Sequence, residues 1–155
     1  MLLLFAIIDF GFVYANQISV RQGVREGARA AAVAAFGSST SCLNPFTSGM
    51  TPSTDMQELM CTVKNRIGIS SPSVYVKIGF DSSYAVNSGI YVCALTSARS
   101  ITGVTSQLLG TGFLKTKVEM SIEQLSSTPG SEAGGEEAPP SGASWSWCTA
   151  AGSTP

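Results

Sequence analysis

Residues 1–36 read MLLLFAIIDFGFVYANQISVRQGVREGARAAAVAAF, and this stretch decides the fold. No proline interrupts it, and its second half is rich in Ala, Arg, Glu and Gln, which form helices readily. The stretch therefore predicts one helix over residues 1–36, about 54 Å long at a rise of 1.5 Å per residue. The average helix of a globular protein has only about 11–12 residues, so this helix has a purpose of its own.

Small residues recur at every fourth position along the predicted helix. Side chains four residues apart lie on the same helix face, so these positions form one stripe. A stripe of small residues lets a second helix approach closely, as in small-xxx-small packing. The small-residue stripe comprises Gly11, Ala15, Ser19, Gly23, Gly27, Ala31 and Ala35. We therefore predict that the stripe packs against equivalent helices of other copies of the chain.

The start of the helix, residues 1–15, is apolar apart from Asp9. About 20 apolar residues are needed to cross a bilayer, so the segment is either part of a membrane span or the apolar region of a signal peptide. Val13-Tyr14-Ala15 resembles a cleavage site. The small-residue stripe runs straight through this site, which favours a helix that is kept in the mature protein.

A second four-residue repeat is made of charges, namely Arg21, Arg25 and Arg29, with Glu26 beside them. These residues form either a solvated helix face or a set of charges that meet Asp9 or Glu26 of a neighbouring subunit, because a carboxylate in an apolar helix needs a partner. The positive-inside tendency would hold the following residues in the cytoplasm. The cysteines indicate the opposite side of the membrane, because disulfides form in an oxidising compartment. We therefore predict that the residues after the helix lie outside the cytoplasm.

The composition argues against an enzyme. The 155 residues include no histidine, which removes the commonest general base and most zinc sites. We find no nucleophile–base pair, so we expect no catalysis, no cofactor and no metal. The net charge of −1 gives no reason to expect nucleic acid as a partner. Only 12% of residues are charged, which suits a surface covered in part by lipid or by other subunits.

The cysteines are Cys42, Cys61, Cys93 and Cys148, and none lies in a CxxC pair. An even number of widely spread cysteines after an apolar start indicates two disulfides formed in an oxidising compartment, with buried free thiols as the alternative. Three pairings are possible. We predict Cys42–Cys61 and Cys93–Cys148, because each pair closes a loop on an irregular segment.

Residues 37–125 are expected to form a small α+β head. Residues 38–53 are rich in turn formers, and residues 100–109 read as a short helix or turn. A helix is expected from Thr54 or Asp55 to Ile67, with a capping-box pattern at its start. Apolar and polar residues then alternate as in strands at 73–80, 90–98 and 113–124. The predicted fold class is thus α+β, with a long N-terminal helix, a short helix and a three- to four-stranded antiparallel sheet.

The tail, residues 126–155, is rich in Ser, Gly, Pro and acidic residues, a composition that cannot bury enough apolar area to fold alone. Trp145, Trp147 and Cys148 nevertheless lie within it. One interpretation is a disordered linker. We favour an extended polar tail that Cys148 pins onto the head.

Two blocks of the sequence resemble TadE-like proteins of tight-adherence (type IVc) pilus systems. The N-terminal block comprises AIIDFG at residues 6–11 and VREGARAAA at 24–32. The later block comprises SITG at 100–103, LLG at 108–110 and IEQ at 122–124. The resemblance leaves the tail outside. It implies a bacterial pseudopilin or minor pilin whose helix inserts in the inner membrane and whose head lies outside.

The resemblance also implies handling by a secretion ATPase and a prepilin peptidase, although we assign no residue to the peptidase site. The expected function is that of a structural subunit, stored in the membrane and assembled by helix packing into an extracellular Tad-like pilus. Its expected partners are copies of itself or other pilins, membrane lipid before assembly, and the assembly machinery. The alternative is a membrane-anchored extracytoplasmic binding or adhesion module that does not polymerise.

Overall fold

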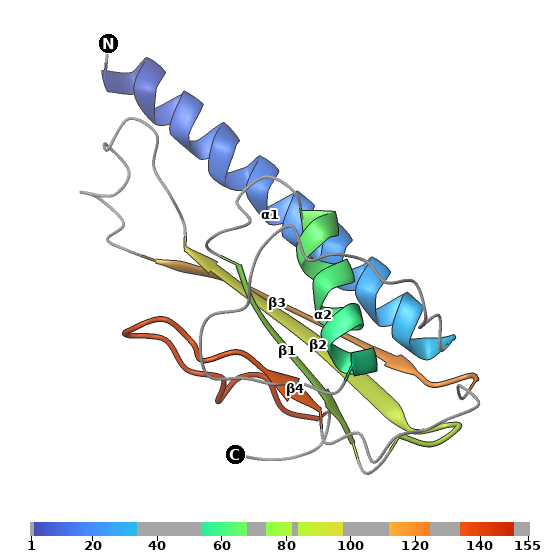
Figure 1. Cartoon of the computed structure of the whole chain (residues 1–155). Helices are drawn as coiled ribbons and strands as arrows, with labels where there is room; N and C mark the ends of the chain where they lie inside the picture. Colours follow the sequence, from blue (N-terminus) through green and yellow to red (C-terminus); the bar gives the residue numbers. More distant parts are fainter. Residues whose placement is uncertain are drawn as a thin grey trace.

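The computed structural model describes residues 2–33, 54–67, 74–81, 84–97, 112–124 and 134–150. Within these residues the chain forms two helices and one antiparallel sheet, which confirms the α+β fold class (Figure 1). The elements are α1 (Leu2–Ala32), α2 (Thr54–Ile67), β1 (Val74–Phe80), β2 (Gly89–Ser97), β3 (Phe113–Ser121) and β4 (Gly135–Glu136).

Both helices lie where the sequence predicts them. Helix α2 has the expected bounds, whereas α1 ends at Ala32, before the predicted end at residue 36. The physical reason is visible at its last residue. The Ala32 carbonyl oxygen accepts hydrogen bonds from the backbone N–H groups of Glu123 (2.9 Å) and Gln124 (3.2 Å), so a segment following β3 caps the helix. The predicted loop and turn regions at 38–53 and 100–109 lie outside the described residues.

The strands pair in the order β3-β2-β1-β4, and every neighbouring pair is antiparallel. The register places Val76 of β1 opposite Ala94 of β2, and Val92 of β2 opposite Val118 of β3. Between β1 and β2 the chain turns at Asn87, whose φ of 67° lies in the left-handed region that Asn tolerates better than most residues. Strand β3 therefore lies at one edge of the sheet, and the short β4 covers the other.

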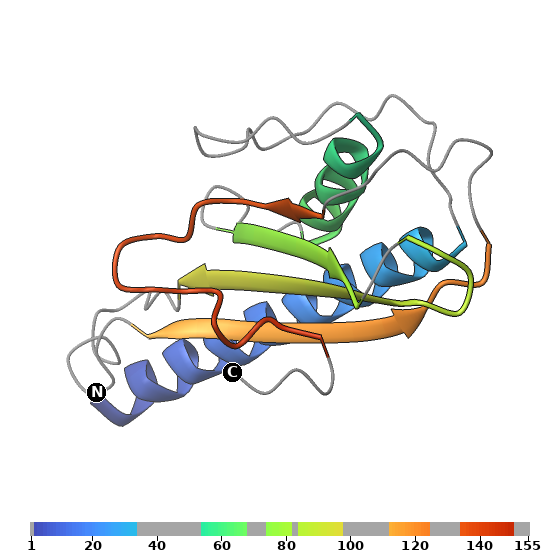
Figure 2. The ribbon, with the colours of Figure 1, turned by 90° about the horizontal axis from the view of Figure 1, so that it is seen from below.

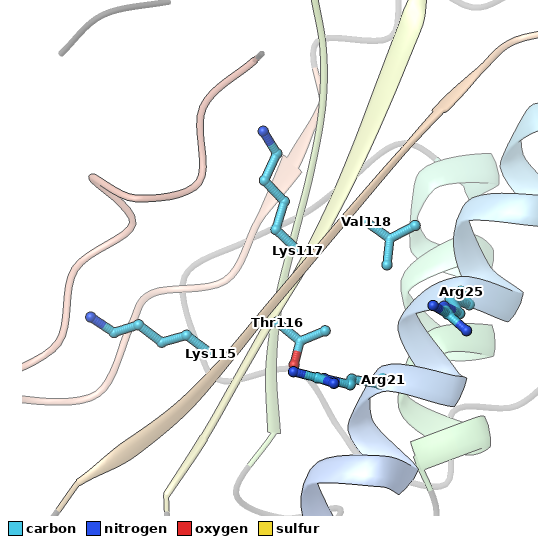
Figure 3. A pocket seen from close by; sticks show the side chains of 6 residues that line it. All are labelled: Arg21, Arg25, Lys115, Thr116, Lys117 and Val118. Atoms are coloured by element: carbon cyan, nitrogen blue, oxygen red, sulfur yellow. The ribbon is translucent and has the colours of Figure 1, made fainter.

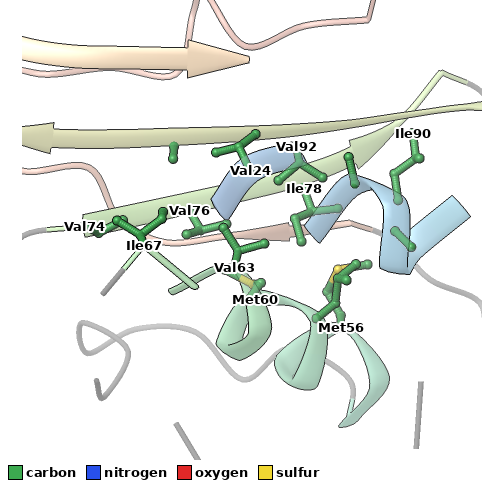
Figure 4. Packing of buried hydrophobic residues seen from close by; sticks show 14 of the residues in the cluster. Val24, Met56, Met60, Val63, Ile67, Val74, Val76, Ile78, Ile90 and Val92 are labelled. Atoms are coloured by element: carbon green, nitrogen blue, oxygen red, sulfur yellow. The ribbon is translucent and has the colours of Figure 1, made fainter. Parts of the chain in front are cut away.

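The main core lies between the sheet and the two helices, which occupy the same face of the sheet (Figure 1). Apolar side chains from α1, α2, β1 and β2 meet there (Figure 4). Helix α2 rests on glycines of α1: a Cβ atom at Gly23 would lie 2.3 Å from Ile67 Cγ1, and one at Gly27 would lie 2.1 Å from Val63 Cγ2. The Ser19 hydroxyl donates to the Ile67 carbonyl oxygen at 2.7 Å, which satisfies a carbonyl at the end of α2.

The opposite face of the sheet is covered by the C-terminal segment, residues 134–150 (Figure 2). The predicted Cys93–Cys148 disulfide is confirmed and joins this segment to β2. Trp145 packs beside the disulfide, and its indole N–H donates to the Glu137 carbonyl oxygen at 2.8 Å. Cys61 is also disulfide-bonded, and its predicted partner Cys42 lies outside the described residues.

A buried ion pair connects α2 to the C-terminal segment. The Lys64 ammonium lies 2.6 Å from Glu137 Oε1, and both side chains are shielded from solvent. The Val76 backbone N–H donates to Glu137 Oε2 at 2.8 Å, so the same carboxylate also binds β1. Glu137 thus holds together a helix, a strand and the segment that follows β4.

Candidate functional site

The first half of α1 carries large apolar side chains that face solvent. Leu3 is 74% exposed, Ile7 64% and Phe10 68%. This part of the helix extends beyond α2, which packs along the second half only (Figure 1). The exposed apolar side chains are Leu3, Leu4, Phe5, Ile7, Ile8, Phe10, Tyr14 and Ile18. A continuous apolar surface of this kind marks contact with a membrane or with another protein.

The small-residue stripe is covered at one end and exposed at the other. The C-terminal part of the stripe packs within the chain and not between chains, because α2 already lies against Gly23 and Gly27. Ala31 is buried in the same core. At Gly11, by contrast, an added Cβ would meet nothing within 4 Å, and Ala15 is exposed. The N-terminal part of the stripe, at Gly11 and Ala15, is therefore open to a partner helix. Ala35 lies outside the described residues.

The predicted intersubunit charges also differ in exposure. Asp9 is 0% exposed and already makes an interaction within the chain. Burial of Asp9 inside the subunit favours an internal role over pairing with a neighbour. Arg21, Arg25, Glu26 and Arg29 are all exposed, and their pairing between subunits stays a prediction.

Two of these arginines border a pocket that sequence reasoning missed. Arg21 and Arg25 of α1 lie opposite residues 115–118 of β3, around a hollow of about 260 Å³ that we call the basic pocket. Thr116 and Val118 point toward α1, whereas Lys115 and Lys117 point to the other side of β3 (Figure 3). The residues of α1 and β3 that line the pocket are far apart in the sequence, so no local sequence pattern indicates the pocket.

The region Leu3–Ala32 of α1 is long and apolar enough to cross a membrane, judged by length and composition. Its second half is built into the α+β head, whereas most large apolar side chains of its first half are exposed, although Asp9 is buried there. We call this first half the bare half. These features fit a protein that is anchored in a membrane by α1.

Residues 1–29 match the TadE-like protein family. No curated protein and no solved structure matches the chain. The family match and the apolar helix together fit a pilin-like, membrane-anchored subunit. The match covers the exposed half of α1 and most of the half that α2 covers.

Proposed function

We propose that this chain is a structural subunit that is stored in the membrane by the first half of α1 and then assembles into an extracellular, Tad-like filament. One observation carries the proposal: the helix that forms part of the head core continues without a break into a bare apolar half. Each exposed Leu, Ile or Phe there would gain roughly 1.5–3 kcal/mol on full burial. Lipid supplies that burial before assembly, and neighbouring helices supply it afterwards.

The open part of the small-residue stripe supports helix packing as the means of assembly. Gly11 and Ala15 are four residues apart, exposed, and flanked by large apolar side chains such as Phe10 and Tyr14. This is the small-xxx-small arrangement that lets helix backbones approach each other closely. The head then forms the outer surface of the filament, and copies of the chain or other pilins are the partners.

The test is to fill the stripe where it is open. A variant with Gly11→Leu and Ala15→Leu should still enter the membrane and form the Cys93–Cys148 disulfide, but its yield of purified surface filaments should fall at least tenfold. Phe10→Leu is the matched control, since it keeps an apolar side chain beside the stripe and should leave filaments intact. Normal filaments from the double variant would contradict helix packing at these positions. A wild-type chain that never leaves the membrane would instead identify an anchored binding module.

A further inference from the structure

The basic pocket holds positive charge that the described residues do not balance. Its lining contains no acidic side chain, and neither Arg21 nor Arg25 forms an ion pair within the part of the chain that the structure describes. Lys117 is different, because it lies 3.1 Å from Glu119 Oε2 on the other side of β3. The two guanidinium groups thus remain free to bind an anion that comes from outside the chain.

A buried hydroxyl in the same pocket also lacks a partner. Thr116 is 8% exposed, and its Oγ1 atom makes no hydrogen bond. Its side chain points toward Arg21 across the pocket (Figure 3). Buried hydroxyl groups are nearly always hydrogen-bonded, because leaving one unsatisfied is unfavourable. An acceptor oxygen held between Thr116 and the arginines would satisfy it.

We propose that the basic pocket is an oxyanion site that binds a phosphate group. Two guanidinium groups and one hydroxyl place donors around one small volume, and a phosphate group offers several acceptor oxygens to meet them. Arginine matches phosphate geometry with paired N–H donors, and such charge-assisted hydrogen bonds are strong. The volume of about 260 Å³ is far more than one water needs and suits a small ionic group.

The position of the pocket along α1 indicates where the phosphate comes from. Arg21 lies about 27 Å along the helix from Leu3, at 1.5 Å per residue. This distance is close to the thickness of the hydrocarbon core, about 30 Å. A subunit anchored by its apolar half therefore carries the pocket at the level of the lipid headgroups. The lipid source rests on the membrane anchoring in the proposed function, whereas the phosphate chemistry does not.

The experiment uses the full chain in micelles of a non-ionic, phosphate-free detergent, with NMR signals of Thr116 and of the Arg21 and Arg25 side chains as readout. One arm adds phosphatidylglycerol to the micelles, and the other adds inorganic phosphate. We expect both to shift these signals in a saturable way. Joint Arg21→Gln and Arg25→Gln replacement should weaken binding at least tenfold, and Thr116→Val by about two- to tenfold, as loss of one hydrogen bond implies.

Two control variants separate the pocket from general effects. Arg29→Gln removes an exposed arginine of α1 that does not line the pocket, and it should leave binding unchanged. Thr96→Val removes another buried hydroxyl without a partner, this one outside the pocket lining. It should also leave phosphate binding intact. If Arg29→Gln weakened binding as much as the pocket variants do, the proposal would be overturned.

The two arms distinguish the sources. Saturation by phosphatidylglycerol at lower concentration than by inorganic phosphate supports a lipid headgroup, whereas a response to inorganic phosphate alone supports a free phosphate and overturns the lipid source. No response in either arm overturns the site. If the signals shift with protein concentration alone, the pocket binds a carboxylate of a second copy of the chain. That result would also overturn the phosphate site. Flotation of the wild-type chain with uncharged vesicles tests anchoring separately.

Discussion

Gly23 and Gly27 lack side chains, and this lets α2 pack closely against α1. Their Cα atoms face Ile67 and Val63 of α2 so closely that an added Cβ would overlap a side-chain carbon of each. Val63 cannot yield easily, because it is fully buried and its β-branched side chain has few rotamers. The close approach of the two helices therefore depends on glycine at these positions.

Gly27→Ala should lower the free energy of unfolding by about 1–2 kcal/mol, since overpacking outweighs the gain in helix propensity. Gly11→Ala is the matched control, because the added methyl group at residue 11 meets open space. It should leave stability unchanged or raise it slightly. Thermal denaturation of the full chain in detergent, followed by circular dichroism, measures both. Equal effects of the two variants would show that α2 does not rest on Gly27.

Lys64→Met tests the buried ion pair. It removes the ammonium group that lies 2.6 Å from the buried Glu137 carboxylate, so we expect a loss of about 3–5 kcal/mol of stability. Lys77→Met is the control, because Lys77 pairs with Glu136 at 2.7 Å at the partly exposed edge of the sheet. The Lys77→Met variant should lose less than about 1 kcal/mol of stability. Urea titration of both variants measures the difference, and similar midpoints would refute the assigned role of Glu137.

At the scale of elements, α1, α2 and three strands could be predicted because each carries its own periodicity. The alternation of Leu114, Thr116 and Val118 with Lys115 and Lys117, for instance, is enough to place β3 and its two faces. No such pattern exists for β4, which is only two residues long and pairs with Lys77 and Ile78 of β1.

The division of the small-residue stripe could not be predicted for a different reason. Four-residue spacing is the same whether the facing helix comes from the same chain or from another. Only the placement of α2 shows that Gly27 faces inward and Gly11 outward. The basic pocket could not be predicted from the sequence for a similar reason, because Arg21 and Thr116 come together only when α1 lies across β3.

The C-terminal segment is the element whose attachment is easiest to test. Joint Cys93→Ala and Cys148→Ala replacement opens a loop with a sequence separation of 55 residues. The loop-entropy estimate for that length is a loss of about 4 kcal/mol. Ser146→Ala, at an exposed position in the same segment, is the control and should change little. Hydrogen exchange at Trp145 and Ala143 should become faster in the cysteine variant, and unchanged protection there would contradict pinning by the disulfide.

At the scale of the whole molecule, the sheet has helices on one face and the C-terminal segment on the other, and α1 projects from this body (Figures 1 and 2). The exposed apolar side chains of α1 gather on its first half, while Trp145 and Trp147 lie on the face of the sheet turned away from α1. A membrane that takes up the bare half of α1 should leave both tryptophans outside the bilayer.

Fluorescence quenching tests this arrangement. In vesicles whose acyl chains carry bromine, emission from Trp145 and Trp147 should remain within about 10% of its value in ordinary vesicles, because bromine quenches only at short range. A variant in which Phe10→Trp adds an indole to the bare half should lose a large part of the added emission. Strong quenching of the wild-type chain would place the head within the bilayer and contradict the proposed anchoring.

Covering of the β1 edge depends on β4, which follows β1, β2 and β3 in the chain and leaves the ribosome after them. Before β4 and Glu137 arrive, β1 presents unpaired backbone groups to any passing strand, and such open edges invite aggregation. Oxidation of Cys93 with Cys148 then makes the closure durable. The supply of thiol oxidant while the chain folds would therefore govern how much newly made protein avoids aggregation.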